Sequence, residues 1–386
     1  MAINPKKLFA AFLAVCMALT ISGCNGGGES TSGETSETSE AEEAPIKVGY
    51  IYHGSADEGR SAEFDAQRKK AQSHSTVETC YIENVMISDF EAAVKMLADE
   101  GCGTIVSTNP VYANVLTSTA GKYMNINFIG YGIALRSVNI FAYTEHTFQG
   151  AYAAGTAAAF NSQNEKIGIV CDTDMLYPIP VINAAALGMQ LVYSDARLMA
   201  AFGTKPDELR SAVDMLTDAG CDVIICYTEN SEAEKYCESK GIKFISSLDH
   251  SADSSEYENM LMYFYSSRDS FYLSQFKKLQ LDAWETDSYV GSMNNGVVDV
   301  SDALPAAKDG TADILSALIP KITTGKALIF SGELKDTTGS IKYMQNDVMT
   351  ITEVYNMSWY VQGVEILGNL RQPQADLVTS NLEIKY

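Results

Sequence analysis

AVKMLADEGCGTIV at Ala93–Val106 and AVDMLTDAGCDVII at Ala212–Ile225 are identical at eight of fourteen positions. The same offset of 119 residues aligns Lys47–Gly49 with Lys166–Gly168. Each long block combines an apolar pattern of helical period, a glycine at its end and a short β-rich run. The chain therefore contains an internal repeat of helix and strand units.

Each half of the repeat reads as strand, helix, strand, helix, strand. We expect first strands at Lys47–Tyr52 and Lys166–Asp172, followed by helices near Ser61–Ser73 and Ile182–Ser194. Alternating apolar strands and helices are typical of parallel sheets with both faces covered. The sequence thus predicts an α/β protein with two similar lobes and a cleft between them. Two unrelated α/β domains are the alternative, but a constant offset in two separate blocks disfavours it.

The N-terminus has the pattern of an export signal. Lys6 and Lys7 precede the apolar run Leu8–Ile21, which is short for a permanent membrane helix. The run leads into Cys24, so we expect cleavage after residue 23 and lipid attachment to Cys24, with an ordinary signal peptide as the alternative. Residues 24–45 are expected to form a disordered acidic tether, which leaves residues 46–386 as the folded part.

The composition excludes several classes of protein. The formal charge of −22 argues against a nucleic-acid partner, because phosphate contacts need lysine and arginine. Four scattered histidines and eight cysteines without a C-x-x-C pair give no metal site, and no cofactor is expected. Of the six cysteines after Cys24, five lie in or beside apolar strand-like runs (Cys80, Cys102, Cys171, Cys221 and Cys226), so we expect free buried thiols.

The segment Gly54–Ser61 (GSADEGRS) has the spacing of a phosphate-binding loop, with Arg60 in the place of the lysine. Asp57 and Glu58 within it would repel a triphosphate, so nucleotide hydrolysis is disfavoured. No nucleophile and base can be paired from any other motif. The protein is therefore not expected to be an enzyme.

Aromatic and acidic residues follow several predicted strands. In open α/β sheets, ligands bind beyond the carboxyl ends of the strands. Aromatic faces combined with carboxylates suit a flat, hydrogen-bonding ring. This pattern gives six candidate ligand contacts: Tyr52, Tyr131, Tyr177, Tyr227, Glu229 and Asp249.

Seven ordered segments together resemble the BMP (basic membrane protein) family of substrate-binding lipoproteins, in its purine-binding branch. They are Lys47–Tyr52 (KVGYIY), Gly59–Arg68 (GRSAEFDAQR), Gln149–Gly155 (QGAYAAG), Pro178–Asn183 (PIPVIN), Gly291–Asp299 (GSMNNGVVD), Ser331–Glu333 (SGE) and Trp359–Val364 (WYVQGV). Within the second segment Asp65 and Arg68 match the family, whereas Arg60 and Phe64 replace a tryptophan and a histidine. The resemblance runs from about Ile46 to Val364, and residues 365–386 lie beyond it.

The resemblance implies a type I periplasmic-binding-protein fold with two Rossmann-like lobes, parallel sheets and a hinge. We expect the first lobe to begin with residues 46–155 and the second with residues 156–257, the remainder crossing between them. It also implies a monomeric, lipid-anchored receptor on the extracytoplasmic face of the cell membrane. Such a receptor captures a purine nucleoside or nucleobase and delivers it to an ABC permease with its ATPase.

Specific roles follow for the candidate ligand contacts. Asp65, Glu229 and Asp249 would accept hydrogen bonds, and Asn109 and Asn183 could donate or accept them. The expected stacking partners are Tyr52, Phe64, Tyr131, Tyr177 and Tyr263. The rival interpretations are a receptor for a sugar, amino acid or signalling molecule, a surface enzyme, and an adhesin or sensor that no longer transports. A carboxylate ligand would need Arg60 or Arg136.

Overall fold

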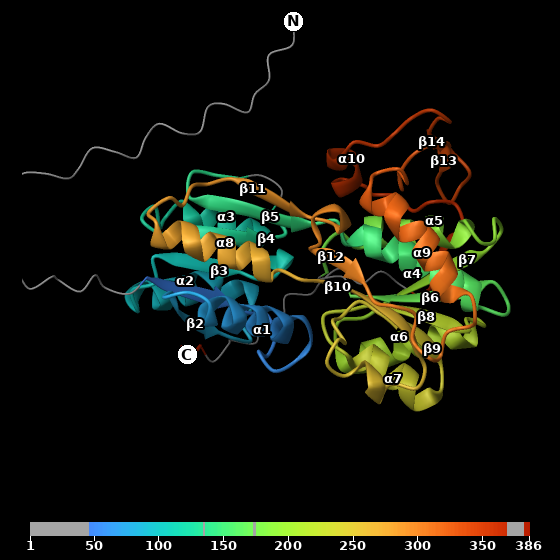
Figure 1. The fold of residues 1–386 in the computed structure, drawn as a ribbon, viewed down its shortest axis with the longest axis horizontal. Coiled ribbons are helices and arrows are strands. Elements are labelled where there is room, and N and C mark those ends of the chain that lie inside the picture. Colours follow the sequence, from blue (N-terminus) through green and yellow to red (C-terminus); the bar gives the residue numbers. More distant parts are fainter. Residues whose placement is uncertain (1–45, 134–135, 173–174, 369–381) are drawn as a thin grey trace, which may run out of the picture. The chain divides into compact units, whose positions relative to one another are not determined.

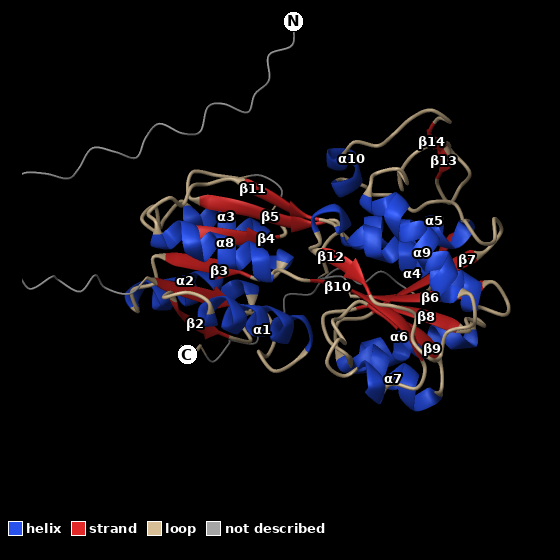
Figure 2. Ribbon diagram, viewed as in Figure 1, coloured by secondary structure: helices blue, strands red, loops and turns tan. Residues whose placement is uncertain are grey.

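The computed structural model describes residues 46–133, 136–172, 175–368 and 382–386. They form two α/β lobes, each built on a sheet with helices on both faces (Figures 1 and 2). The first sheet has the strand order β11-β5-β4-β3-β1-β2, and all of its pairs are parallel. Its lobe comprises β1 (Lys47–Ile51), α1 (Gly59–Ser73), β2 (Glu78–Ile82), α2 (Phe90–Asp99), β3 (Thr104–Ser107), α3 (Ala113–Ala120), β4 (Asn127–Tyr131), β5 (Ile140–Glu145), α8 (Asp269–Gln280) and β11 (Ser288–Gly291).

The second sheet has the order β12-β10-β9-β8-β6-β7-β15, in which only β12 runs antiparallel to its neighbour. Its lobe comprises α4 (Thr147–Asn161), β6 (Lys166–Cys171), α5 (Pro178–Gln190), β7 (Arg197–Phe202), α6 (Pro206–Asp218), β8 (Val223–Tyr227), α7 (Glu232–Lys240), β9 (Lys243–Ser246), β10 (Met260–Ser266), β12 (Val298–Val300), α9 (Thr311–Thr323) and β15 (Val364–Ile366). A two-stranded hairpin of β13 (Leu334–Lys335) and β14 (Ile341–Tyr343) and the short α10 (Ile351–Tyr355) complete the α-helices and β-strands described in this lobe.

The internal repeat is confirmed by the sheets. The order β5-β4-β3-β1-β2 in the first lobe corresponds to β10-β9-β8-β6-β7 in the second. Gly49 and Gly168, which are 119 residues apart, lie at equivalent places: a Cβ atom on either would meet a leucine side chain at 2.8–3.0 Å, from Leu97 and Leu216 respectively. The repeated glycine thus lets the repeated helix pack directly on the strand. Buried apolar side chains cover both faces of each sheet, as expected for parallel strands.

The chain passes between the lobes three times in the described residues: after β5, after β10 and after β11. The first crossing lies near residue 146, so the expected extent of the first lobe to residue 155 is wrong. Helix α4 packs against α5 and β10 of the second lobe. The reason is a close helix contact at two glycines: a Cβ on Gly155 would lie 2.0 Å from the carbonyl oxygen of Ala185, and one on Gly188 would lie 2.0 Å from that of Tyr152.

The last described residues return to the first lobe. Tyr81 on β2, the edge strand, donates its N–H to the carbonyl of Lys385 (2.7 Å) and accepts the N–H of Lys385 (2.8 Å). The side chain of Lys385 also pairs with Glu83. Every described helix is too short or too polar to cross a bilayer.

Candidate ligand-binding site between the lobes

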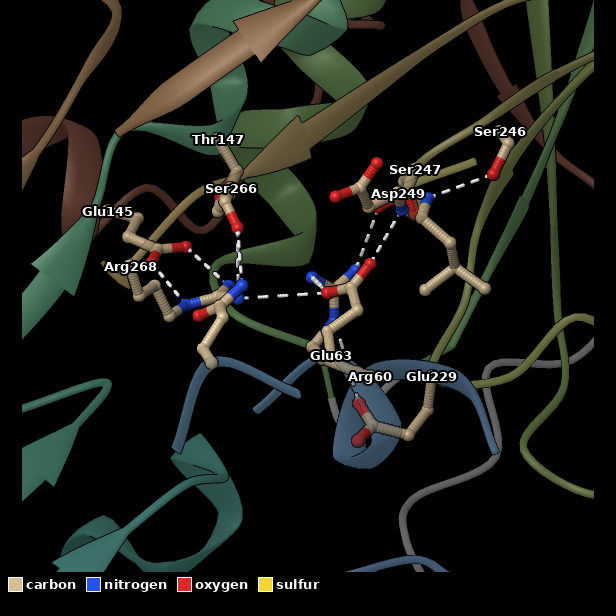
Figure 3. Close-up of polar contacts among 12 residues, drawn as sticks. Arg60, Glu63, Glu145, Thr147, Glu229, Ser246, Ser247, Asp249, Ser266 and Arg268 are labelled. Carbon is tan, nitrogen blue, oxygen red and sulfur yellow. Dashed lines mark hydrogen bonds and ion pairs between the residues drawn. The ribbon is translucent and has the colours of Figure 1, made fainter. Parts of the chain in front are cut away.

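The first turn of α1 contacts the carboxyl ends of two strands in the other lobe. The N–H of Arg60 donates to the carbonyl of Glu229 after β8 (2.8 Å), and its Nη2 donates to the carbonyl of Ser247 after β9 (3.1 Å) (Figure 3). Gly59 allows this approach because it has a φ of +53° and any Cβ would lie 2.2 Å from the Glu229 carbonyl oxygen. The two lobes are therefore in direct contact at the predicted ligand-binding edge.

Glu63 lies at the centre of this contact. Its Oε1 accepts the N–H of Asp249 from the second lobe (2.7 Å). Its Oε2 lies 3.5 Å from Arg60 Nη1 and 3.7 Å from Arg268 Nη1. Burial raises the pKa of Glu63, although Arg60 and Arg268 favour its ionised form. A carboxylate from α1 thus joins a loop of the second lobe to the crossing after β10.

Arg268 and Glu145 form a fully buried ion pair between the first two crossings. Arg268 Nε and Nη2 donate to the two carboxylate oxygens at 2.6 and 2.9 Å. Tyr131 and Tyr143 donate their hydroxyl groups to the same carboxylate at 3.1 and 2.6 Å. Burial alone would raise the pKa of Glu145, but Arg268 holds it below its usual value. The guanidinium also lies 4.3 Å from the ring centre of Phe64.

Four buried polar atoms at this edge have no hydrogen-bond partner among the described residues. They are Arg60 Nε, Ser107 Oγ at the end of β3, Asn109 Nδ2 and Ser247 Oγ. All four residues are at most 4% exposed. Because native proteins satisfy almost all buried polar groups, atoms of this kind mark places where a ligand or water completes the network. Ser107 and Asn109 lie at the carboxyl end of β3 in the first sheet, and Ser247 follows β9 in the second sheet. Arg60 connects the two lobes.

A groove of about 640 Å³ adjoins this contact. The exposed side of α1 forms one wall, from Gly59 to Lys70, and the loop from Leu248 to Tyr257 forms the other. Glu63 and Asp249 both line it, so the groove leads to the inter-lobe contact.

Several predicted residues lie near the inter-lobe network. Phe64 contacts Tyr131 edge to face, with ring centres 5.3 Å apart. Tyr227 donates its hydroxyl to the carbonyl of Leu176 (2.6 Å). Tyr177 adopts a left-handed backbone conformation (φ +50°) and stacks on Tyr355 at 4.3 Å. Asn109 and Glu229 each follow the end of a strand, β3 and β8 respectively.

Other predicted residues are engaged within one lobe. Tyr52 donates to Asp65, whose carboxylate also pairs with Arg68 and Lys69 at 2.7 Å each, inside the first lobe. Asn183 bonds to the carbonyl of Trp359 and the N–H of Val361. Tyr263 packs against His250, and the carboxylate of Asp249 accepts the N–H of Ser251. Arg136, the other arginine considered for a carboxylate ligand, is exposed beside Asp287. Cys24 lies outside the described residues.

Ser246, His250 and Asp253 have the distances of a catalytic triad but not its chemistry. His250 lies 3.0 Å from Ser246 Oγ through Nε2 and 2.8 Å from Asp253 through Nδ1. However, Ser246 is fully buried, and its hydroxyl donates a hydrogen bond to Glu234 (2.6 Å). The same carboxylate is also hydrogen-bonded to His250. The hydroxyl is therefore not available as a nucleophile. Among the described residues, no group of His, Cys, Asp and Glu is arranged to hold a metal ion.

Glu63, Glu145 and Arg268 were not among the residues predicted from the sequence. Glu145 ends one strand and Arg268 comes two residues after another, so the rule that found Tyr131 and Glu229 also applies to them. Glu63 lies on a helix, four residues from its start, and no strand-end pattern identifies it.

Comparison with known proteins agrees with this architecture. A curated relative from Haloferax volcanii, a putative ABC transporter glucose-binding protein, is 26% identical over 88% of this chain and 83% of its own length. Solute-binding proteins of ABC transporter systems from Aeropyrum pernix and Conexibacter woesei superpose with TM-scores of 0.63 and 0.59. They are 15% and 14% identical, covering 76% and 73% of this chain and 93% and 97% of their own.

These structures share the expected type I periplasmic-binding-protein fold. A family model described as ABC transporter substrate-binding protein, PnrA-like, matches residues 46–300. The chain therefore belongs to the Bmp family of ABC transporter substrate-binding proteins, which act on the extracytoplasmic side.

Proposed function

We propose that this substrate-binding protein captures a purine nucleoside or nucleobase between its lobes and passes it to an ABC permease. The observation that carries the proposal is the set of buried polar atoms at the facing edges that make no hydrogen bond within the described residues: Arg60 Nε, Ser107 Oγ, Asn109 Nδ2 and Ser247 Oγ. They lie in the region that also contains Phe64, Tyr131 and the carboxylates of Glu63 and Glu229. Amide, hydroxyl and carboxylate groups beside aromatic rings suit a flat heterocycle rich in donors and acceptors.

Each group has a defined role in this proposal. Glu229, whose Oε2 lies 3.9 Å from Arg60 Nε, accepts a hydrogen bond from a ring N–H or a ribose hydroxyl. Asn109 donates through Nδ2, because its Oδ1 already accepts the N–H of Val111 (3.0 Å). Phe64 supplies an aromatic wall. Binding holds both lobes at once and so favours the closed arrangement.

A sugar is the second candidate ligand. The relative from Haloferax volcanii is described as a putative glucose-binding protein, and its match covers 88% of this chain. Carboxylates, an arginine and an amide beside aromatic rings can also bind the hydroxyl groups and the apolar face of a pyranose.

A thermal-shift panel separates these candidates, since a ligand that binds only the folded state raises the melting temperature. Adenosine, guanosine, inosine and hypoxanthine form one arm, and glucose and ribose form the other. We expect a shift with a purine compound. A shift with glucose and none with any purine would assign the protein to the second class.

Calorimetry on two variants then tests the site itself. Glu229→Gln keeps the size of the side chain and removes its charge, so we expect it to weaken purine binding about tenfold to a hundredfold, as for a charge-assisted hydrogen bond of about 1.5–3 kcal/mol. Arg136→Ala is the control, because Arg136 is exposed and contacts the carbonyl of Thr286 (3.2 Å) and the carboxylate of Asp287 (3.9 Å). Equal affinities for wild type and Glu229→Gln would exclude Glu229 from the site.

We further propose that the protein is anchored by lipid on Cys24. The support is the basic and apolar N-terminal segment followed directly by Ile21-Ser22-Gly23-Cys24. Wild-type protein should partition into detergent and lack residues 1–23, and Cys24→Ala should do neither. Processing and membrane retention of Cys24→Ala at the wild-type level would contradict the anchor.

A further inference from the structure

Two buried cysteines of the first lobe are in direct contact. Cys80 lies on β2, Cys102 lies in the turn between α2 and β3, and their sulfur atoms are 3.4 Å apart. They are 3% and 1% exposed. The sequence alone led us to expect that both would remain free thiols.

The internal repeat shows what is particular to this pair. The residues 119 positions further on are Met199 and Cys221, and the Cys221 thiol contacts the Met199 sulfur at 3.6 Å. Both lobes therefore bring two sulfur atoms together at the same place in the fold. Only the first lobe has two thiols there, so only this lobe can join them.

We propose that Cys80 and Cys102 form a disulfide in the exported protein, linking edge strand β2 to the turn before β3. Proteins of this family act outside the cytoplasm, where disulfides form and persist. The contact needs only a small approach of two side chains that already face each other. The inference does not depend on which ligand the protein binds.

The reaction is an ordinary exchange with a disulfide oxidant, such as oxidised glutathione or the disulfide of an oxidoreductase. One cysteine thiolate attacks the oxidant and forms a mixed disulfide, which releases one reduced thiol. The second cysteine thiolate then attacks this bond, the Cys80–Cys102 bond forms, and a second thiol leaves. Two protons and two electrons are removed from the pair, and the oxidant takes up both electrons. The hydrogen bond from Cys102 lowers the pKa of Cys80, which favours a thiolate at this position.

Differential alkylation of the full exported chain tests the proposal. The protein is unfolded without reductant, its free thiols are blocked with N-ethylmaleimide, and it is then reduced and labelled with iodoacetamide. We expect the second label on Cys80 and Cys102. Cys221 serves as the matched internal comparison, because it is 5% exposed, occupies the equivalent place in the second lobe and contacts the sulfur of Met199 instead of a second thiol. N-ethylmaleimide on Cys80 and Cys102 would overturn the proposal.

A stability measurement gives an independent readout. The disulfide would close a loop of about 22 residues and should raise the melting temperature of wild-type protein by about 5–10 °C over its reduced form. Cys102→Ala should show no difference between oxidising and reducing glutathione buffers. Equal melting temperatures for oxidised and reduced wild type would also overturn the proposal, even if Cys102→Ala failed to fold.

Discussion

The buried ion pair between Arg268 and Glu145 should make the two lobes sensitive to loss of either partner. Both side chains are fully buried, and the carboxylate accepts two hydrogen bonds from the guanidinium and one from each of two tyrosines. Glu145→Gln removes the charge, keeps the shape and leaves the guanidinium with Glu63, 3.7 Å away, as its remaining acidic neighbour. Removing one partner of a buried pair costs about 3–5 kcal/mol. At about 2–4 °C per kcal/mol, this corresponds to a fall in melting temperature of roughly 6–20 °C.

The double variant Glu145→Leu with Arg268→Met is the matched comparison. It removes both charges and their desolvation cost, so it should be more stable than Glu145→Gln alone. Thermal unfolding followed by circular dichroism at pH 7 measures both. Melting of Glu145→Gln within 2 °C of wild type would refute the reasoning, because it would mean that the pair contributes little more than a surface ion pair.

Three further variants test other parts of the structure. Gly155→Ala should lower the free energy of unfolding by about 1–3 kcal/mol or more, because its Cβ would lie 2.0 Å from a backbone oxygen. Gly103→Ala, whose Cβ would have no atom within 4 Å, should leave this free energy unchanged in chemical denaturation. Burial alone would lower the pKa of His250, but Glu234 and Asp253 raise it to about 9. The stability that the charged His250 contributes is therefore complete below about pH 6.5, its usual pKa, and is lost as the pH rises through 9. His250→Gln should abolish this dependence of the melting temperature on pH. Asp65→Asn should lower the free energy of unfolding in urea by about 3 kcal/mol and leave ligand affinity unchanged, because the Asp65 carboxylate pairs with Arg68 and Lys69 inside the first lobe. A tenfold loss of affinity without loss of stability would instead assign Asp65 to the binding site.

The sequence was sufficient to predict two repeated α/β lobes because the repeat carries its own packing contacts. A glycine on a strand and a leucine on a helix recur together, as Gly49 with Leu97 and as Gly168 with Leu216. The lobe to which α4 belongs could not be predicted in the same way. Its apolar pattern would fit either sheet, and the decision depends on the fit of Gly155 to a helix that is distant in the sequence.

The candidate site was predicted only in part, for a similar reason. Strand ends identified Tyr131, Glu229 and Tyr227, because the carboxyl edge of a parallel sheet follows from the order of the strands. The contact between Arg60 and Ser247 joins residues 187 positions apart, and no local pattern predicts it. Asp65 was assigned to the ligand because its spacing from Arg68 was taken as a family motif, whereas in the structure the two side chains pair with each other.

The return of the last described residues to β2 has a consequence for self-association of the protein. An exposed edge strand offers its unpaired N–H and C=O groups to any neighbouring chain. An open edge of this kind would favour sheet-to-sheet association between copies of the protein. The paired backbone groups of Tyr81 and Lys385 occupy part of that edge, and Lys385 adds a charge beside it. We therefore expect the bridge between Tyr81 and Lys385 to limit sheet-to-sheet association through this part of the edge.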